Sequence, residues 1–513
     1  LYILLFISNQ SITFTPITFI MKSVSYLATI LVTLFSAAFL PQNAIAQTKK
    51  VVVVGQEKEY ADEEIEFFTR TDYITQQREV LAKTTVAPDG AFRVEFPLFE
   101  TQLVMVDLGV YTCYMYMEAG KSYRVAFPPR RDKTASERLN PYFDPVVLQL
   151  RDLNGDGKST NDLIARFDAY VDSVSNATLP RIADRDSLVS GKRLVEKLKS
   201  YTIPAQYEFA NQYKEYRIGL MSYMTETQRI QALSKTYFQN RSVLHRNPAY
   251  MELFNIVYDK YLVYHGRTED GQQIYNAISK ERNYTKLKEI LAQNDHLTND
   301  TLCELVILKG LYDEFFSSNF SRNALFSIVD SIYSTTDIPE HTNIAQQIRE
   351  RISKFLPGFI PYSFTLKDAK GQSLSLKDFR GYMVLLCFCT TTSYSCIQDF
   401  DLLNRFQERY SEHLRIISIC ADQDSASMHR FVKATHYQWT FLHYGDAPNL
   451  IRDYDVRTYP TYFLLDPEGR IILSPAPGPQ ENLERILFEQ FRQRRWQPRM
   501  PKSNDGRGMR GRS

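Results

Sequence analysis

Cysteine is scarce in this sequence, and neither sign of charge is in excess. The 513 residues include six cysteines, and 61 Lys and Arg residues against 59 Asp and Glu residues give a net charge of +2. Cys113 and Cys303 lie in separate regions, and the other four cysteines fall within residues 387–420. This placement excludes a disulfide-stapled scaffold. The balanced charge implies no partner attracted by overall electrostatics, and the length suggests about two to four globular domains.

The N-terminal part has the features of a targeting signal. Lys22 follows Met21, residues 26–40 are mostly apolar, and Ala44-Ile45-Ala46 offers small residues at a cleavage position. We interpret residues 21–46 as a signal peptide. The protein is therefore expected to be exported to the periplasm or cell envelope, with no membrane span after signal cleavage.

Residues 1–20 are interpreted as sequence upstream of the true start, because a signal peptide should begin near Met21. The alternative is a single membrane anchor over residues 1–40. It is disfavoured because residues 8–15 are mostly polar and interrupt the apolar run.

Residues 47–130 alternate in the manner of strands, with turn signals such as Pro88-Asp89-Gly90 between the runs. The pattern predicts an antiparallel β sandwich of about six or seven strands, since each strand needs a partner and a covered face. The expected strands are 51–54, 64–69, 91–96, 102–108, 111–117 and 123–127.

Residues 140–355 change to helical spacing and predict a helical domain. Leu163, Phe167 and Tyr170 fall on one face, and similar stripes recur as far as Tyr333. We interpret these aromatic residues as core rather than as a ligand groove. The domain is expected to position the C-terminal region or to bind a partner.

One motif in this region is similar to the first half of a calcium loop. Asp152, Asn154, Asp156 and Gly157 have the required spacing, but the twelfth position is Leu163. A solvated turn explains the same residues, because Asn, Asp and Gly favour turns. No metal site and no cofactor are expected.

The stretch from Gly381 to Phe400 carries the main functional signal. Residues 383–389 are uncharged and apolar, as expected for a central parallel strand that is covered on both faces. Residues 390–395 supply turn and helix-capping residues.

From about residue 357 to about residue 490 the sequence resembles the exported thioredoxin-like thiol-disulfide oxidoreductases of the TlpA/ResA type. The similarity rests on four segments: FRGY at 379–382, the strand at 385–389, Tyr459-Pro460-Thr461 and LLDPEGR at 464–470. It implies a thioredoxin-like α/β fold for residues 357–490. Residues 47–130 resemble, more loosely, the small β domain that often precedes such domains in exported Bacteroidota proteins.

The resemblance places the family's Cys-x-x-Cys on Ser393-Tyr394-Ser395-Cys396, so a serine stands where the attacking cysteine is expected. In such enzymes a thiolate at a helix N-terminus attacks the substrate disulfide, and the second cysteine resolves the mixed disulfide. A serine hydroxyl can do neither.

Other parts of the site are implied by the same resemblance. Asp399 matches an acidic residue that tunes thiol ionisation, and Pro460 matches a cis-proline that pairs with the substrate main chain. Tyr459, Pro460 and Tyr394 are the expected substrate-binding residues. A turn proline and an acidic residue near a helix start also have purely structural explanations.

Cys387 and Cys389 stand two residues apart on one strand, so their side chains share a face. One hypothesis is that Cys387 or Cys389 pairs with Cys396 and forms a relocated redox couple. The alternative is that all three are small buried packing residues, which is common for cysteines in core strands.

Three functions are compatible with these residues. We favour a thioredoxin-fold binding protein of the cell envelope that has lost dithiol chemistry and binds a protein or peptide beside Tyr459-Pro460. The second is an oxidoreductase that uses Cys396 with Cys387 or Cys389. The third, an enzyme with Ser393 as nucleophile, is disfavoured because no histidine lies nearby in sequence to act as its base.

The last segment, residues 491–513, is basic and rich in Gly and Arg. We expect a disordered, solvated tail there rather than a nucleic-acid-binding segment.

Overall fold

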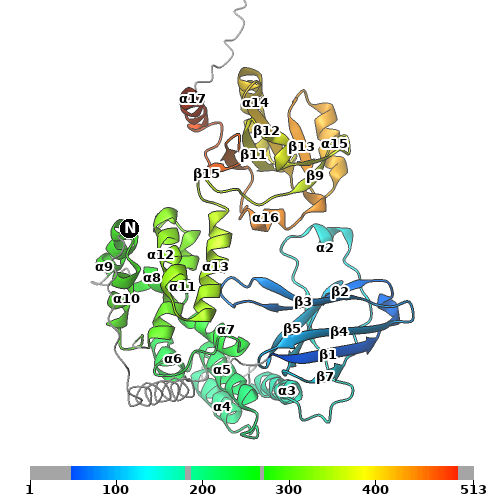
Figure 1. Cartoon of the computed structure of the whole chain (residues 1–513), viewed down its shortest axis with the longest axis vertical. Coiled ribbons are helices and arrows are strands. Elements are labelled where there is room, and N and C mark those ends of the chain that lie inside the picture. The colour runs from blue at the N-terminus through cyan, green and yellow to red at the C-terminus, as the bar shows by residue number, and fades with distance from the viewer. Residues whose placement is uncertain (1–47, 179–186, 266–270, 298, 495–513) are drawn as a thin grey trace, which may run out of the picture. The chain divides into compact units, whose positions relative to one another are not determined.

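The computed structural model describes residues 48–178, 187–265, 271–297 and 299–494 (Figure 1). The predicted signal peptide, the residues before it and most of the predicted tail lie outside the described residues. The described part contains, in chain order, a β region, a helical region, and a second sheet with flanking helices. Within these ranges, no helix combines the length and the apolar character needed to cross a membrane.

The β region forms a three-stranded sheet in the order β4-β1-β7 and a five-stranded sheet in the order β3-β2-β5-β6-β8. Its strands are β1 (Lys49–Gln56), β2 (Glu64–Arg70), β3 (Arg78–Thr85), β4 (Ala91–Leu98), β5 (Gln102–Leu108), β6 (Tyr111–Met117), β7 (Ser122–Arg124) and β8 (Val146–Gln149).

Side chains from both sheets share one hydrophobic core. Val53 of β1 and Phe92 of β4 are buried with Phe67 of β2 and Met115 of β6. Along β4, buried and more exposed residues alternate, and this period of two gives the strand one face for the core. The apolar alternation in the sequence is therefore what makes these segments strands.

The predicted antiparallel arrangement is wrong at two pairs of strands. β1 pairs with β7 in parallel, and β6 pairs with β8 in parallel. The chain between β6 and β8 includes the short helix α2 (Ala135–Leu139), and a connection of this length lets a strand re-enter the sheet in the same direction. β8 also shows that the helical region begins later than residue 140.

The helical region extends from α3 to α13 in the described residues. Its helices are α3 (Thr160–Thr178), α4 (Ser187–Lys199), α5 (Glu208–Met224), α6 (Ile230–Tyr237), α7 (Pro248–Val257), α8 (Tyr261–His265), α9 (Gly271–Tyr275), α10 (Tyr284–Ala292), α11 (Asp300–Phe315), α12 (Arg322–Thr335) and α13 (Pro339–Ser353).

α11 is the central helix of this region, since most of its residues are buried. It begins after Asn299, whose side chain accepts a hydrogen bond from the Leu302 N–H at 3.0 Å. Because α11 is covered on every side, its polar residue Glu304 is buried too. A buried carboxylate needs hydrogen-bond donors around it.

The C-terminal sheet has seven strands in the order β10-β9-β13-β12-β11-β14-β15. β11, β12 and β13 run in parallel, while β14, β15 and β9 join with antiparallel pairing. The strands are β9 (Thr365–Asp368), β10 (Ser373–Ser375), β11 (Met383–Cys389), β12 (Leu414–Cys420), β13 (Thr440–His443), β14 (Thr461–Leu465) and β15 (Ile471–Ala476).

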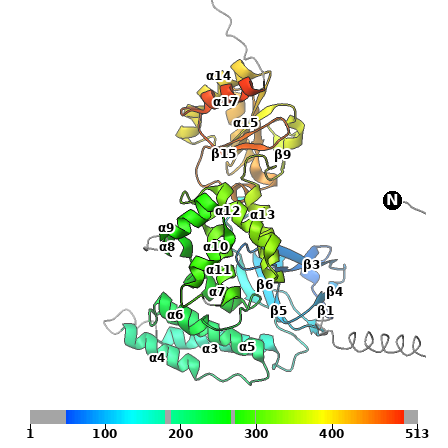
Figure 2. The ribbon, with the colours of Figure 1, turned by 60° about the vertical axis from the view of Figure 1, so that its left-hand side comes forward.

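Helices cover both faces of this sheet. One face packs against α14 (Tyr394–Tyr410) and α17 (Leu483–Gln493), which lie side by side in Figure 2. The rings of Tyr410 on α14 and Phe491 on α17 are 5.0 Å apart. The other face packs against α16 (Leu450–Asp453). β11 is therefore buried at every residue, which explains its continuous apolar sequence.

An aromatic cluster closes the side of the sheet near β13 and α15 (Ser425–Ala434). The Trp439 ring lies 5.8 Å from that of Phe400 and 5.1 Å from that of Phe441. Its indole N–H donates to the Ser418 hydroxyl at 2.9 Å. The tryptophan is thereby held between α14 and the sheet.

The predicted strand at 383–389 is confirmed as β11. The prediction of a tail from residue 491 is wrong for its first residues, because α17 continues to Gln493 and Phe491 is buried.

Candidate active site

The turn between β11 and α14 lies at the carboxyl end of the parallel strands, where open α/β sheets place their functional groups. Ser393 is the N-cap residue of α14, and its hydroxyl makes no capping hydrogen bond. The Thr391 N–H and hydroxyl donate to the Asp422 carboxylate at 3.0 and 2.9 Å. Because Asp422 follows β12, these bonds fix the turn to the neighbouring strand.

Four buried cysteines surround this end of the sheet. Cys387 and Cys389 lie on β11, Cys420 ends β12, and Cys396 lies in the first turn of α14. The register of β11 and β12 sets Cys389 opposite Cys420, and their sulfur atoms are 3.8 Å apart. The Cys389 thiol also donates to the Ile419 carbonyl at 3.7 Å. All four are fully buried free thiols.

Their surroundings keep these thiols protonated. Burial raises the pKa of Cys387 well above its usual value, and burial also raises the pKa of Cys396. The contact with Cys387 lowers the pKa of Cys389, but the contact with Cys420 and burial outweigh it. The thiolate is the nucleophile in disulfide exchange, so a raised pKa is opposite to the shift that activates a thiol.

The predicted cis-proline is confirmed, since the Tyr459-Pro460 peptide bond is cis. Pro460 immediately precedes β14, whose first residue pairs with Phe388 of β11. Burial raises the pKa of Tyr459 to about 12, with smaller contributions from neighbours that include Cys389 and Cys396. The cis-proline segment therefore lies beside the cysteine cluster.

Asp399 is buried one turn further along α14, where its carboxylate is fully engaged. It accepts hydrogen bonds from the Tyr462 hydroxyl at 2.8 Å and from the Gln480 side-chain amide at 2.6 Å. These three residues and Pro460 line an open groove of about 1030 Å³. The predicted acidic residue thus faces a groove beside the cis-proline.

The first turn of α14 presents apolar side chains to solvent. Tyr394 is 73% exposed and Ile397 is 38% exposed. The Tyr394 hydroxyl accepts a hydrogen bond from the Gln398 side chain at 2.7 Å, which orients the ring along the helix. This surface adjoins Ser393 and is available for contact with another molecule.

The structure brings the predicted Cys387, Cys389 and Cys396 into one cluster, with Asp399 near them. Sequence reasoning missed Cys420 as a member of the cluster. The signal was present in the sequence, because Cys420 ends the mostly apolar run that forms the next parallel strand, β12, and parallel strands end at the same edge of a sheet.

Tyr462 and Gln480 were also missed. Tyr462 lies on β14, two residues after the cis-proline. Gln480 lies 81 residues from Asp399 and is part of no local motif.

This strand order, with a helix N-terminus and a cis-proline beside one end of the central strands, defines a thioredoxin-like α/β fold. Residues 360–474 match the AhpC/TSA family. The chain is 32% identical over 129 residues to the thiol-disulfide oxidoreductase ResA of Bacillus thuringiensis, covering 24% of this chain and 73% of ResA.

A second relative is the thioredoxin-like protein YneN of Bacillus subtilis, 32% identical over 111 residues. That match covers 21% of this chain and 64% of YneN, slightly less than two thirds of its length.

Two solved structures are also similar. The thioredoxin domain of a thiol-disulfide oxidoreductase from Bacteroides vulgatus shows 22% identity and a TM-score of 0.25, covering 26% of this chain and 98% of that one. A thiol-disulfide oxidoreductase from Bacteroides fragilis shows 25% identity and a TM-score of 0.23, covering 25% and 97%. From the sequence relatives, the chain belongs to the thioredoxin-like AhpC/TSA family, with ResA thiol-disulfide oxidoreductases among its relatives.

Proposed function

We propose that this is an exported protein of the periplasm or cell envelope that binds a protein or peptide partner at the cis-proline surface, without ordinary dithiol-disulfide exchange. The proposal depends on the position of Ser393. It occupies the N-cap of α14, three residues before Cys396, where the resemblance expects the attacking thiol.

The remaining sulfurs do not replace that thiol. Cys396 is fully buried, and its pKa is raised by burial. A productive exchange site needs an accessible thiol whose pKa is lowered toward neutrality. A hydroxyl at the helix start and a buried neutral thiol behind it do not meet that requirement.

The proposed binding surface is made of the groups around Pro460. Tyr394 and Ile397 expose apolar area on α14, and the groove lined by Asp399 and Tyr462 offers polar groups beside it. An extended peptide suits such a surface, because its main chain can pair with backbone next to the proline while its side chains enter the groove. Binding of this kind needs no sulfur chemistry.

Insulin reduction by dithiothreitol tests the loss of exchange activity. We expect no acceleration by the wild-type protein and a partial gain in Ser393→Cys, because the variant restores an accessible thiol three residues before Cys396. Ser395→Cys is the matched control, since it adds an exposed thiol to the same helical turn with the wrong spacing. Wild-type turnover comparable to that of ordinary thioredoxin-like proteins would refute the proposal.

A second candidate is an oxidoreductase with a relocated couple, formed by Cys396 with Cys387 or Cys389. The structure also contains two sulfur atoms close enough for redox chemistry, but they belong to Cys389 and Cys420 and not to the predicted couple. The sulfur of Cys389 lies 3.8 Å from that of Cys420, and direct neighbours on paired strands have a Cα separation that a disulfide can bridge.

Peptide mapping after equilibration in redox buffers separates these possibilities. Six free thiols across the whole range of buffers would eliminate the second candidate. A disulfide from Cys396 to Cys387 or Cys389 would support it, and a disulfide from Cys389 to Cys420 would move the couple onto the two strands.

A further inference from the structure

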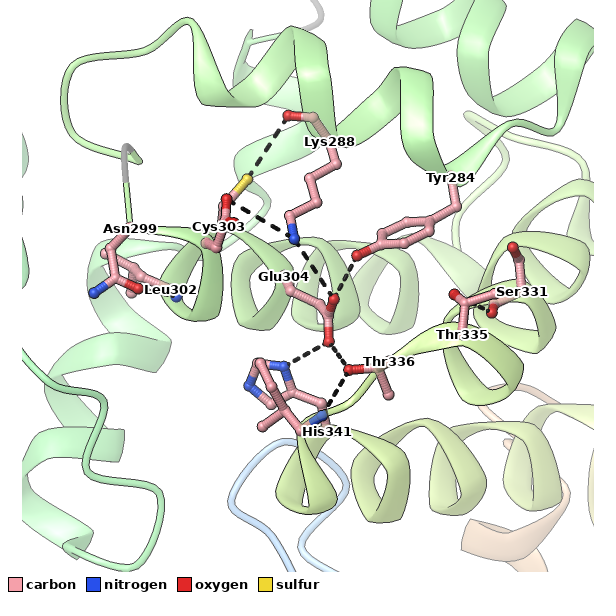
Figure 3. A network of polar contacts seen from close by, with 12 residues as sticks. Tyr284, Lys288, Asn299, Leu302, Cys303, Glu304, Ser331, Thr335, Thr336 and His341 are labelled. Atoms are coloured by element: carbon pink, nitrogen blue, oxygen red, sulfur yellow. Dashed lines mark hydrogen bonds and ion pairs between the residues drawn. The ribbon is translucent and has the colours of Figure 1, made fainter. Parts of the chain in front are cut away.

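A buried carboxylate in the helical region is surrounded by hydrogen-bond donors (Figure 3). The Glu304 side chain on α11 is 4% exposed, and its two oxygens accept hydrogen bonds from the Tyr284 and Thr336 hydroxyls and from His341. The Lys288 ammonium lies 3.9 Å from the same carboxylate. These groups come from α10, from α13 and from the segment before α13, so the carboxylate joins several elements.

This carboxylate is ionised over the whole physiological range. Burial by itself raises the pKa of Glu304, but the hydrogen bonds from His341, Thr336 and Tyr284 lower it to about 2. Because an ionised carboxylate only accepts hydrogen bonds, the His341 Nδ1 atom, which lies 2.8 Å away, must carry a proton.

The other ring nitrogen of His341 contacts a second histidine. His341 is fully buried in the first turn of α13, and its Nε2 atom is 3.0 Å from Nε2 of His245. His245 lies just before α7 and lines a pocket of about 140 Å³ together with Arg246 and Glu340. The carboxylate, the buried histidine and the half-buried histidine therefore form a row that ends at this pocket.

The hydrogen bond between the two histidines requires a proton on one of the two facing Nε2 atoms and none on the other. With a proton on either Nε2 atom, one ring donates and the other accepts at 3.0 Å. If both rings became imidazolium ions, both facing nitrogens would carry hydrogens, and the hydrogen bond would be replaced by repulsion between like charges. Full protonation of the pair is thus incompatible with the contact.

We infer that His245 and His341 form a pH-sensitive switch, which holds the loop before α7 to the first turn of α13 at neutral pH and releases it in acid. The switch lies outside the thioredoxin-like domain and does not depend on the proposed function. Its proton enters through His245, the member of the row that lines the pocket.

The charged groups around His245 set the direction of the effect. Glu340 on α13 favours its protonation, while His341 and Arg246 oppose it. Arg246 is paired with Glu100 at 3.1 Å. The remaining charged groups at the pocket wall are Asp72 and Arg70, and those on the far side of His341 are Glu304 and Lys288.

Burial, followed by His341, lowers the pKa of His245 to about 4 in the closed arrangement. A free histidine has a pKa of about 6.5, so the closed contact is fully favoured above that pH and is lost as the pH falls toward 4. Between pH 7.0 and 4.5 this difference increases the equilibrium constant for opening on the order of 50-fold.

Hydrogen–deuterium exchange of the full chain at pH 7.0 and pH 4.5, corrected for intrinsic rates, tests this inference. In the wild type we expect a large, selective loss of protection at residues 241–247 and in the first turn of α13. His245→Gln should remove most of this pH response, because its amide can occupy the Nε2 position but does not titrate. His436→Gln, at an exposed position of the C-terminal domain, should leave the response unchanged.

Equal corrected protection at the two pH values in the wild type would overturn the switch, as would a full acid response in His245→Gln. If that variant proves unstable, 15N-histidine spectra of the wild type give an independent result. They should show a protonated Nδ1 on His341 and one bare Nε2 between the two rings at pH 7. Two protonated Nε2 atoms in the folded protein would contradict the inference.

Discussion

Two buried clusters in this protein hold their ionisable groups in opposite charge states. In the C-terminal sheet the thiols of Cys387 and Cys389 stay neutral, with their pKa raised. In the helical region the Glu304 carboxylate stays ionised, with its pKa lowered to about 2. Burial disfavours the charged form at both sites, so the difference comes from their neighbours.

The neighbours differ in the hydrogen bonds that they offer. Glu304 receives hydrogen bonds from two hydroxyls and an imidazole. Cys389 faces the Cys420 sulfur and the Ile419 carbonyl, neither of which stabilises a thiolate well. A buried ionisable group keeps its charge only where donors replace water. By this criterion the surroundings of Cys389 favour the neutral thiol, while those of Glu304 favour the carboxylate anion.

The largest effect on the free energy of unfolding is expected from removing the negative charge of Glu304. Glu304→Gln should reduce the free energy of unfolding by roughly 3 to 5 kcal/mol, because the amide cannot accept all of the donors that face it. Urea unfolding measures this loss. Asp300→Asn on the same helix, where the side chain is 83% exposed, is the control and should cost less than about 1 kcal/mol. A similar small cost for Glu304→Gln would show that the carboxylate is not held by its donors.

The opposite test introduces polarity into the sulfur cluster. Cys420→Ser should cost about 2 kcal/mol, because a fully buried hydroxyl has little to bond with at that position, and Cys420→Ala about 1 kcal/mol for the lost sulfur contacts. Urea unfolding of the two variants gives the comparison. If serine is tolerated as well as alanine, the cluster is more polar than its surroundings suggest.

Asp399 is intermediate between Glu304 and the buried cysteines in the number of hydrogen bonds that it receives. It is buried and accepts hydrogen bonds from two neutral donors. Asp399→Asn should cost about 1 to 1.5 kcal/mol, because the amide nitrogen must face either the Tyr462 hydroxyl or the Gln480 amide. Thermal unfolding at neutral pH measures it, with the exposed Asp401→Asn on the same helix as the control. An unchanged melting temperature would mean that both hydrogen bonds are dispensable.

The smallest effect on stability is expected from Ser393→Cys. The side chain is half-buried and makes no capping bond, so stability should change by less than about 0.5 kcal/mol. Its thiol should nevertheless react with Ellman's reagent at pH 7 in the folded protein, because a helix N-terminus lowers a thiol pKa below about 8.5. The wild type should react only after denaturation. Rapid reaction of any thiol in the native wild type would contradict the statement that the buried cysteines stay neutral while Glu304 is ionised.

Much of the C-terminal domain could be predicted, since its strands are buried on both faces and give continuous apolar runs. The residues 383–389 expected as a strand are those of β11. In the β region, β5 and β6 begin and end where alternation places them, at 102–108 and 111–117. Strong periodicity allowed these boundaries to be found.

The missed elements lack such a pattern. β3 is mostly exposed along its length, so its sequence shows no apolar alternation. The contacts among Glu304, His341 and His245 were missed because these residues are far apart in sequence. His341 is 37 residues from Glu304 and 96 from His245, and no local motif connects them. Contacts of this kind depend on how α11 and α13 pack, and sequence spacing does not encode that packing.

The position of Trp439 has a practical consequence for all of these measurements. The sequence contains two tryptophans, and the other, Trp496, lies outside the described residues. Because the Trp439 indole is packed against Phe400 and bonded to Ser418, its fluorescence should shift when the C-terminal domain loses its packing. The helical region contains no tryptophan and is followed by far-ultraviolet circular dichroism. Ellipticity reports helices of both regions, so a step in ellipticity that leaves the Trp439 emission unchanged is assigned to the part of the chain outside the C-terminal domain.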